Sequence, residues 1–388
     1  MKISIYKIAD KWIGTPLCLV FGGVAKISQL ASLAVKFAPL TLRKLFPKPK
    51  AHSPKRIAVL KLWAIGDSVV SLPMIRSLRR SFPEAKIDVV ARKRNAVVFE
   101  NSSDIDKIVL FEWSNLANVL GLFKKYDLVI DAEPWMRLSA LLALFAGKRR
   151  VGFGGQARSM AYTDTVPCKK SQHMALNYIE MAKAAGAKKI IPAPVELKAS
   201  NIDEQIVEEF LKARGLSGKK LVGICPGGAD AASTRLWPAE RFAELADKLI
   251  EKHKSTVIFV GGPSDIMTID KIQSLMKNKS KSTSAIGKLS IGQLFYLAKK
   301  FRLFVSNDTG PMHIAANQGA PTIGLFGPSL PSLWGPYGKK TTVIYNKLPC
   351  SPCNIDGKTP DCLRKTEKGL CMKLISVKDA LNAASKAF

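Results

Sequence analysis

Short apolar runs alternate with longer amphipathic stretches over most of the chain. In the first half, the runs RIAVLKL, KIDVVA, KIVLF and DLVIDA are short and rich in β-branched residues, which favours strands. Stretches such as VVSLPMIRSLRRSF and RLSALLALFAG have the spacing of helices. Regular alternation of strands and helices predicts an α/β fold with a parallel, doubly wound sheet.

The same alternation restarts after the segment IPAPVEL. Further strands are expected at KLVGICPGG, TVIFVGG, RLFVSND and TTVIY, and helices at PAERFAELADKLIEKH and LSIGQLFYLAKK. A chain of 388 residues with 47% hydrophobic residues is long enough for two cores. We therefore predict two Rossmann-like domains, 53–200 and 201–388, that face a central cleft. Ligands of open parallel sheets bind at the carboxyl ends of the strands, so the loops after the strands are where a site is expected.

Residues 1–52 form a basic extension ahead of the first predicted strand. Between Asp10 and Asp67 the sequence contains ten Lys and Arg residues and no acidic residue. Within the extension, TPLCLVFGGVAKISQLASLAVKFAPL has polar and apolar residues on opposite faces of a helix. A basic amphipathic helix of this kind binds an anionic membrane surface. The alternatives are a signal peptide and a helix packed on the protein itself, whereas Lys26 and Lys36 argue against a membrane span.

The whole chain is strongly basic, with a formal net charge of +30. Such a charge attracts a polyanion, which could be a nucleic acid, an anionic membrane or an acidic glycolipid. Known nucleic-acid recognition motifs are absent from the sequence, and aromatic residues are not interleaved with the basic ones. We therefore expect no nucleic-acid partner.

Three loops after predicted strands in the second half carry polar residues. The loop SNDTGPMH is followed by a short helix rich in small residues, and Gly310 and Pro311 suit the first turn of that helix. The free amides of a helix N-terminus bind anions, so this half is predicted to bind a nucleotide diphosphate. The candidate residues are Thr234, Arg235, Asp265, Asp308, Thr309, Gly310 and His313. The alternative is that the acidic and hydroxyl residues only cap helices and that His313 is a core histidine.

In the first half, the loop LWAIGDSVVSLP places Asp67 where a strand gives way to a helix. The sequence contains neither a GxGxxG fingerprint nor a Walker lysine motif at this position, which argues against hydride transfer and P-loop hydrolysis. A single carboxylate facing a nucleotide site is typical of a general base. The alternative role for Asp67 is a helix cap.

The segments LKLWAIGDSVVSLPMIRSLRRSFPEAKIDVV, RLWP and SNDTGPMHIAANQGAPTIGLFGPS are similar to those of glycosyltransferase family 9, the heptosyltransferases of lipopolysaccharide assembly. The similarity covers about residues 55–375. It implies a GT-B fold, an ADP-heptose donor, and an inverting transfer to a glycolipid without a metal. Together with the basic helix of the extension, we expect a cytoplasmic enzyme associated peripherally with the inner membrane.

The resemblance assigns roles to individual residues. Asp67 matches the catalytic base, and Arg235 stands where the family has a phosphate-binding lysine. Residues 308–310 and His313 match the donor-diphosphate motif, and Asp265 matches a ribose-binding position less closely. The residues expected to contact acidic groups of the acceptor are Lys61, Arg137 and Arg158. The two arginines are equally well explained as exposed solubilising charges.

Four cysteines near the C-terminus, Cys350, Cys353, Cys362 and Cys371, follow a C-x2-C-x8-C-x8-C spacing. In a cytosolic chain such a spacing favours a structural zinc site over disulfides, and free thiols are an equal alternative. We expect no cofactor for catalysis.

Two other functions remain open at this point. A nucleotide-sugar epimerase shares the GT-B architecture and would convert a donor without an acceptor. A non-catalytic basic protein that binds membranes or nucleic acid would explain the charge without any reaction.

Overall fold

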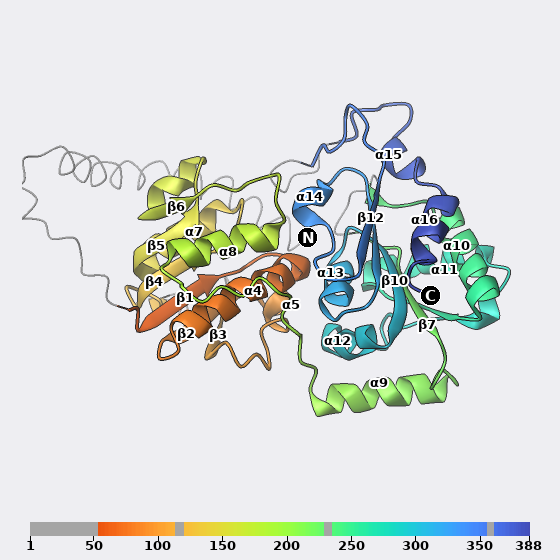
Figure 1. The fold of residues 1–388 in the computed structure, drawn as a ribbon, viewed down its shortest axis with the longest axis horizontal. Helices are drawn as coiled ribbons and strands as arrows, with labels where there is room; N and C mark the ends of the chain where they lie inside the picture. The colour runs from red at the N-terminus through yellow and green to blue at the C-terminus, as the bar shows by residue number, and fades with distance from the viewer. Residues whose placement is uncertain (1–52, 113–119, 229–234, 355–360) are drawn as a thin grey trace, which may run out of the picture.

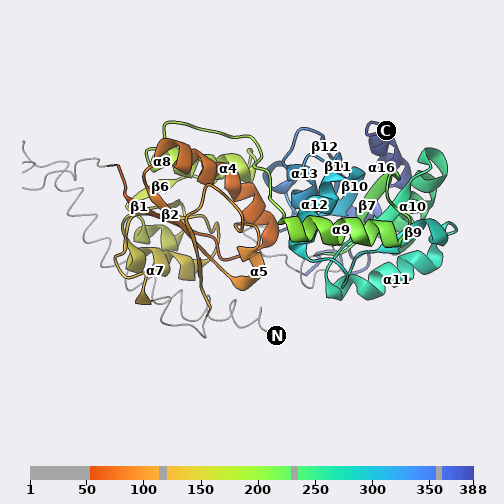
Figure 2. The ribbon, with the colours of Figure 1, turned by 90° about the horizontal axis from the view of Figure 1, so that it is seen from below.

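The computed structural model describes residues 53–112, 120–228, 235–354 and 361–388. The basic extension of residues 1–52 and its expected amphipathic helix lie outside the described residues. The described residues form two α/β halves that lie side by side along the long axis of the molecule (Figures 1 and 2).

The first half contains one six-stranded sheet with the strand order β3-β2-β1-β4-β5-β6, and every pair of neighbours is parallel. Its strands are β1 (Arg56–Leu60), β2 (Lys86–Ala91), β3 (Lys107–Leu110), β4 (Tyr126–Asp131), β5 (Gly147–Phe153) and β6 (Asp164–Val166). The helices that connect or follow them are α4 (Ile65–Ser81), α5 (Lys93–Ala96), α7 (Arg137–Ala146), the 3-10 helix η2 (Ala157–Ala161) and α8 (Met174–Ala184). The predicted strands of this half are thus all present.

The second half contains a parallel six-stranded sheet with the order β12-β11-β10-β7-β8-β9. Its strands are β7 (Leu221–Cys225), β8 (Thr256–Phe259), β9 (Ser282–Ser284), β10 (Phe301–Asn307), β11 (Thr322–Phe326) and β12 (Thr341–Tyr345). Its α-helices are α9 (Asn201–Ala213), α10 (Ala239–His253), α11 (Ile266–Leu275), α12 (Ile291–Lys299), α13 (Gly310–Asn317), α14 (Pro331–Trp334), α15 (Leu370–Lys373) and α16 (Val377–Ala384). Two 3-10 turns, η4 (Pro263–Asp265) and η5 (Lys279–Lys281), complete it.

Helices cover both faces of the second sheet, because its strand residues alternate between two hydrophobic clusters. Ile258 packs with α12 and α13, whereas Val257 and Phe259 pack with α10 and α16. This alternation is the property of a sheet that is buried on both faces. The strand–helix alternation in the sequence correctly predicted such a sheet in each half.

The two halves also contact each other. One hydrophobic cluster contains both Val70 of α4 and Ile314 of α13, so apolar packing continues from one half to the other. Nε2 of His173 lies 2.8 Å from the carbonyl oxygen of Gly335 across the junction, and its ring stacks on Tyr337 with centroids 4.6 Å apart. Within the four described segments, no helix is long and apolar enough to cross a membrane.

Candidate active site

The N-termini of two helices, α4 from the first half and α13 from the second, meet at the junction. A Cβ atom added to Gly66 would lie 2.6 Å from Cδ2 of His313, and one added to Gly310 would lie 3.3 Å from Cβ of Ile65. A side chain at Gly66 would therefore displace His313, and one at Gly310 would press on Ile65. Because both helices follow the carboxyl ends of central strands, each half contributes its strand-end loops to one place.

Asp67 lies in the first turn of α4, which begins at Ile65. The N-cap residue of this helix is Ala64, and it makes no side-chain capping hydrogen bond. Asp67 therefore does not occupy the N-cap position that the alternative interpretation required. Its side chain is 22% exposed and its Oδ2 lies 3.8 Å from Nζ of Lys61.

Burial raises the pKa of Asp67 to about 7, and nearby charges modify that effect. The positive charge of Lys61 lowers this pKa, while the carboxylates of Glu133 and Asp308 raise it. A carboxyl group that titrates near neutral pH exchanges a proton easily under working conditions, which is the property required of a general base.

Lys61 is fully buried at the end of β1. Its Nζ lies 3.1 Å from Oε1 of Glu133 and donates a hydrogen bond of 3.3 Å to the carbonyl oxygen of Ala132. These contacts within the first half do not favour the acceptor role that we predicted for Lys61. The buried ammonium group of Lys61 instead lies between the carboxylates of Asp67 and Glu133, and its positive charge lowers the pKa of Asp67.

Arg235 and Asp308 lie opposite Asp67, on the second half. Nη1 of Arg235 is 3.7 Å from Oδ2 of Asp308. Burial raises the pKa of Asp308, while Arg235 and a hydrogen bond from Ser329 lower it. The effect of both side chains on the pKa of Asp67 places them in the same electrostatic environment as the candidate base.

Thr309 is the N-cap residue of α13 and makes no side-chain capping hydrogen bond. Its Oγ1 instead lies 2.9 Å from Oγ of Ser306 and donates to Sγ of Cys225 at 3.6 Å. The first amides of α13 are thus not satisfied by the Thr309 side chain, and the positive end of the helix dipole faces the junction. This arrangement suits an anion such as a diphosphate.

His313 is only 4% exposed, and burial lowers its pKa to about 3. The imidazole is therefore neutral at physiological pH. Within the described segments, its Nδ1 has no hydrogen-bond partner. The ring lies against Gly66 of the first half, so His313 is at the junction of the two halves rather than inside the core of one.

Asp265 acts as a cap in this structure, because its Oδ2 accepts a hydrogen bond of 2.8 Å from the amide of Gly262. A Cβ on Gly227 would lie 2.3 Å from the same oxygen, so the carboxylate rests on the loop after β7. The ribose-binding role of Asp265 remains a prediction. Thr234 lies outside the described residues.

Arg158 is buried in the first half, with 1% of its surface exposed. Its Nη1 lies 3.3 Å from Oδ2 of Asp131 and 2.8 Å from the carbonyl oxygen of Met136, and Tyr162 donates to the same Asp131 oxygen at 2.6 Å. These contacts favour a structural role for Arg158 rather than acceptor binding or solubility. Arg137, at the start of α7, is partly exposed and remains a candidate for the acceptor.

The sequence interpretation missed Glu133, which follows β4 and contacts Lys61. A signal for it was present, since Glu133 comes directly after the apolar run DLVIDA, at the carboxyl end of a predicted strand. The expectation that site residues follow the carboxyl ends of parallel strands also identified Asp67 and Asp308.

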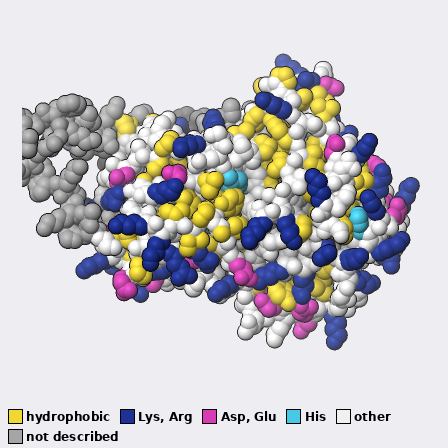
Figure 3. Space-filling view, viewed as in Figure 1, with side chains coloured by type: hydrophobic (Ala, Val, Ile, Leu, Met, Phe, Trp, Pro, Cys, Tyr) yellow, Lys and Arg dark blue, Asp and Glu magenta, His cyan; other side chains and the backbone are white. Residues whose placement is uncertain are grey.

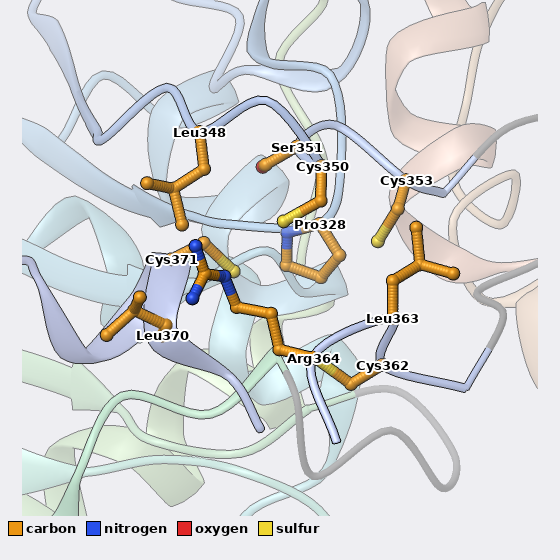
Figure 4. A pocket seen from close by; sticks show the side chains of 10 residues that line it. All are labelled: Pro328, Leu348, Cys350, Ser351, Cys353, Cys362, Leu363, Arg364, Leu370 and Cys371. Carbon is orange, nitrogen blue, oxygen red and sulfur yellow. The ribbon is translucent and has the colours of Figure 1, made fainter. Parts of the chain in front are cut away.

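The four cysteines of the predicted zinc site line one pocket near α15, as Figure 4 shows. Burial is the main reason that the pKa values of Cys353 and Cys371 are raised, and the neighbouring thiols raise them further. Among the residues that the structure describes, no group of three or more His, Cys, Asp or Glu is placed to hold a metal ion.

Positive charge is not confined to the N-terminal extension. On the face shown in Figure 3, Lys and Arg side chains are spread over both halves. The described part of the protein thus contributes to the attraction for an anionic partner that the composition predicts.

Comparison with known proteins supports one interpretation of this site. Residues 116–363 match the model of "Glycosyltransferase family 9 (heptosyltransferase)". The chain is 26% identical over 304 residues to the lipopolysaccharide core heptosyltransferase OpsX of Haemophilus influenzae, covering 76% of this chain and 85% of the relative. It is also 26% identical over 297 residues to lipopolysaccharide heptosyltransferase 2 of Escherichia coli, covering 72% of this chain and 85% of the relative.

Solved structures show the same architecture. A family 9 glycosyltransferase from Veillonella parvula superimposes with a TM-score of 0.71 at 26% identity, covering 86% of this chain and 97% of the other. The E. coli ADP-heptose heptosyltransferase II superimposes with a TM-score of 0.67 at 24% identity, covering 86% of this chain and 98% of the other. The predicted GT-B fold is thereby confirmed. The chain belongs to glycosyltransferase family 9 and is an enzyme that transfers a sugar.

Proposed function

We propose that the protein transfers a heptose from ADP-heptose to an anionic glycolipid acceptor such as a lipopolysaccharide core, by an inverting reaction that needs no metal ion. The relatives OpsX and heptosyltransferase 2 are named for transfer to lipopolysaccharide, which supports this choice of donor sugar and acceptor. In this proposal residues 53–200 bind the acceptor and residues 201–388 bind the nucleotide sugar.

The observation that carries the proposal is the position of Asp67 opposite the N-terminus of α13. A Cβ added to Gly310, the first residue of α13, would lie 3.6 Å from the amide nitrogen of Gly66, the residue before Asp67. A donor whose diphosphate binds at Thr309 and Gly310 would present its anomeric carbon toward Asp67. A single base on one side and a leaving-group site on the other are the parts that a direct displacement requires.

In the proposed reaction, Asp67 removes the proton from an acceptor hydroxyl while that oxygen attacks the anomeric carbon. The bond between this carbon and the phosphate oxygen breaks, and its electron pair leaves on the diphosphate. One displacement inverts the anomeric configuration. Amides of α13 and the guanidinium of Arg235 stabilise the negative charge that develops on the leaving group. Such fixed donors perform the task that a divalent cation performs in other sugar transferases.

Replacing the base tests the mechanism directly. We expect Asp67→Asn to lower turnover by about 10²- to 10⁴-fold, because asparagine keeps the shape of aspartate but cannot accept the proton. ADP affinity should stay close to that of the wild type.

In the wild type, kcat/KM should rise with pH through about 7, since the base is active only when ionised and its pKa is raised to about that value. Steady-state kinetics with ADP-heptose and a lipopolysaccharide core acceptor, with ADP binding measured by calorimetry, provides both readouts. An asparagine variant within about threefold of the wild-type rate would exclude Asp67 as the base.

Replacing Arg235 tests donor binding. We expect Arg235→Ala to weaken ADP binding by about 10- to 150-fold, as is usual when a charged hydrogen bond is lost. Arg235→Lys should retain an intermediate affinity, because lysine keeps the charge without the planar fork. The matched control is Arg302→Ala, which removes an exposed arginine of β10. Equal ADP affinity of the Arg235→Ala variant and the control would contradict the assignment.

We propose that the basic extension attaches the enzyme to the cytoplasmic surface of the inner membrane, where a glycolipid acceptor is found. Support comes from the part of the extension after Asp10, which has seven Lys and Arg residues, no acidic residue and amphipathic spacing. Deletion of residues 1–50 should abolish cosedimentation with anionic lipid vesicles at moderate salt and leave ADP affinity unchanged. Full vesicle binding by the truncated protein would assign membrane binding to the folded halves instead.

We propose a structural zinc site formed by Cys350, Cys353, Cys362 and Cys371. The spacing of the four cysteines and their common position around one pocket support this proposal. Purified protein should contain about one zinc ion per chain by elemental analysis. The Cys353→Ser, Cys362→Ser double variant should lose this zinc and melt at a lower temperature, because structural zinc contributes folding energy. Cys168→Ser, which changes a cysteine of the first half, is the control. Metal-free wild-type protein with unchanged stability would contradict the proposal.

A further inference from the structure

Glu133 has no part in the reaction as described so far, yet it is among the most buried acidic residues next to Asp67. Only 2% of its surface is exposed. Burying a carboxylate is costly unless partners compensate, so its contacts call for an explanation.

One carboxylate oxygen of Glu133 makes three contacts. Oε1 accepts hydrogen bonds from the amides of Leu62 at 2.5 Å and Trp63 at 2.8 Å, and it lies 3.1 Å from Nζ of Lys61. These three donors are consecutive residues of the loop that joins β1 to α4. Glu133, which follows β4, therefore holds this loop from the neighbouring strand.

The loop needs such support, because Ala64 adopts a left-handed backbone conformation with φ of 55°. A residue other than glycine in this region is strained, and strain of this kind persists only where the surroundings impose it. Ala64 is also the residue from which α4 starts, three positions before Asp67. The hydrogen bonds to Glu133 thus fix the direction in which the first turn of α4 presents Asp67.

Glu133 also acts on Asp67 through charge. Lys61 Nζ is 3.1 Å from Glu133 and 3.8 Å from Asp67, so the two carboxylates share one buried ammonium group. The other titratable or charged groups that face this cluster are Asp131 at the end of β4, Tyr178 of α8, His313 of α13, and Arg235 and Asp308 of the second half. Glu133 contacts both the ammonium group of Lys61 and the loop that carries Asp67.

We infer that Glu133 is a positioning residue, which orients Asp67 through the loop of residues 62–64 and makes Asp67 a stronger base by sharing the charge of Lys61. The inference rests on the proposed role of Asp67. With Glu133 present, Lys61 stabilises the ionised form of Asp67 only in part. A neutral residue at position 133 would leave the whole charge of Lys61 to Asp67 and weaken it as a base.

Glu133→Gln separates this role from simple structural support. Glutamine has nearly the same shape, and its carbonyl oxygen can still accept from the amides of Leu62 and Trp63. We expect the variant to fold and bind ADP normally. In the pH profile of kcat/KM, the acidic limb, where activity rises as the base ionises, should move to lower pH by about one unit. This is the lower end of the shift that a nearby charge produces. The rate on the plateau should fall several-fold, because a weaker base transfers the proton less efficiently.

Glu133→Asp provides the complementary variant. Aspartate keeps the negative charge beside Lys61 but is one methylene shorter, so it should hold the loop less well. Its acidic limb should stay near that of the wild type while its plateau rate falls. A purely structural role would lower the rate in both variants and move the acidic limb in neither.

Glu112→Gln is the matched control. Glu112 follows β3 on the same sheet edge and accepts a hydrogen bond of 3.1 Å from the amide of Lys93, so it also supports a loop from a neighbouring strand. Glu112 is not among the groups whose charge affects the pKa of Asp67, so its variant should leave the acidic limb in place.

The turnover of the Asp67→Asn variant, measured alongside the pH profile of Glu133→Gln, distinguishes the two ways in which this inference could fail. If Asp67→Asn abolishes turnover but Glu133→Gln leaves the acidic limb unmoved, the role of Glu133 is wrong and the proposed base stands. If Asp67→Asn retains turnover, the proposed base is wrong and the inference about Glu133 falls with it. A limb displaced to lower pH in Glu133→Gln alone supports the inference.

Discussion

The contact between Gly66 of α4 and His313 of α13 is the constraint on which the rest of the site depends. A Cβ at position 66 would lie 2.6 Å from the imidazole, so this approach is possible only with glycine. The imidazole of His313 lies at the junction in its neutral form, because burial lowers its pKa to about 3. The contact brings the first turn of α4, with Asp67, to the N-terminus of α13. The candidate base and the candidate anion site are thereby brought to one place.

The site combines two opposite electrostatic requirements. The N-terminus of α13 and Arg235 provide positive potential for a diphosphate, whereas a base must keep a high affinity for protons. Burial of Asp67 and the neighbouring carboxylates of Glu133 and Asp308 raise its pKa against the effect of Lys61 and Arg235. The strained backbone of Ala64 belongs to the same arrangement, since it turns the chain from β1 into α4 at the point where Asp67 must face the junction. Such strain is typical of functional sites.

The architecture was predictable from the sequence, because short β-branched runs alternating with amphipathic stretches leave few alternatives to doubly wound sheets. The expectation that ligands bind at the carboxyl ends of parallel strands also located Asp67, Asp308 and the start of α13 from the sequence alone. The same rule could have located Glu133, which follows β4 directly. Lys61 offered a further signal, since a lysine inside the apolar run IAVLKLW is a candidate for burial, and a buried lysine is usually paired with a carboxylate.

Other features could not be read from the sequence. The burial of Arg158 depends on Asp131 and Tyr162, which are brought to it by β4 and the segment after η2. The capping role of Asp265 depends on the local turn at Gly262. The spacing of the four cysteines identified a cluster, but whether the sulfurs converge on a metal ion depends on how the loops around α15 fold.

The central claim is that the junction between the two halves forms a single site in which the donor diphosphate and the base face each other. The most direct measurement is a crystal structure of the enzyme with ADP bound. We expect the diphosphate to accept hydrogen bonds from the first amides of α13 and from Arg235, with its terminal phosphate on the side of Asp67. ADP bound away from α13, or with its terminal phosphate directed away from Asp67, would contradict the account.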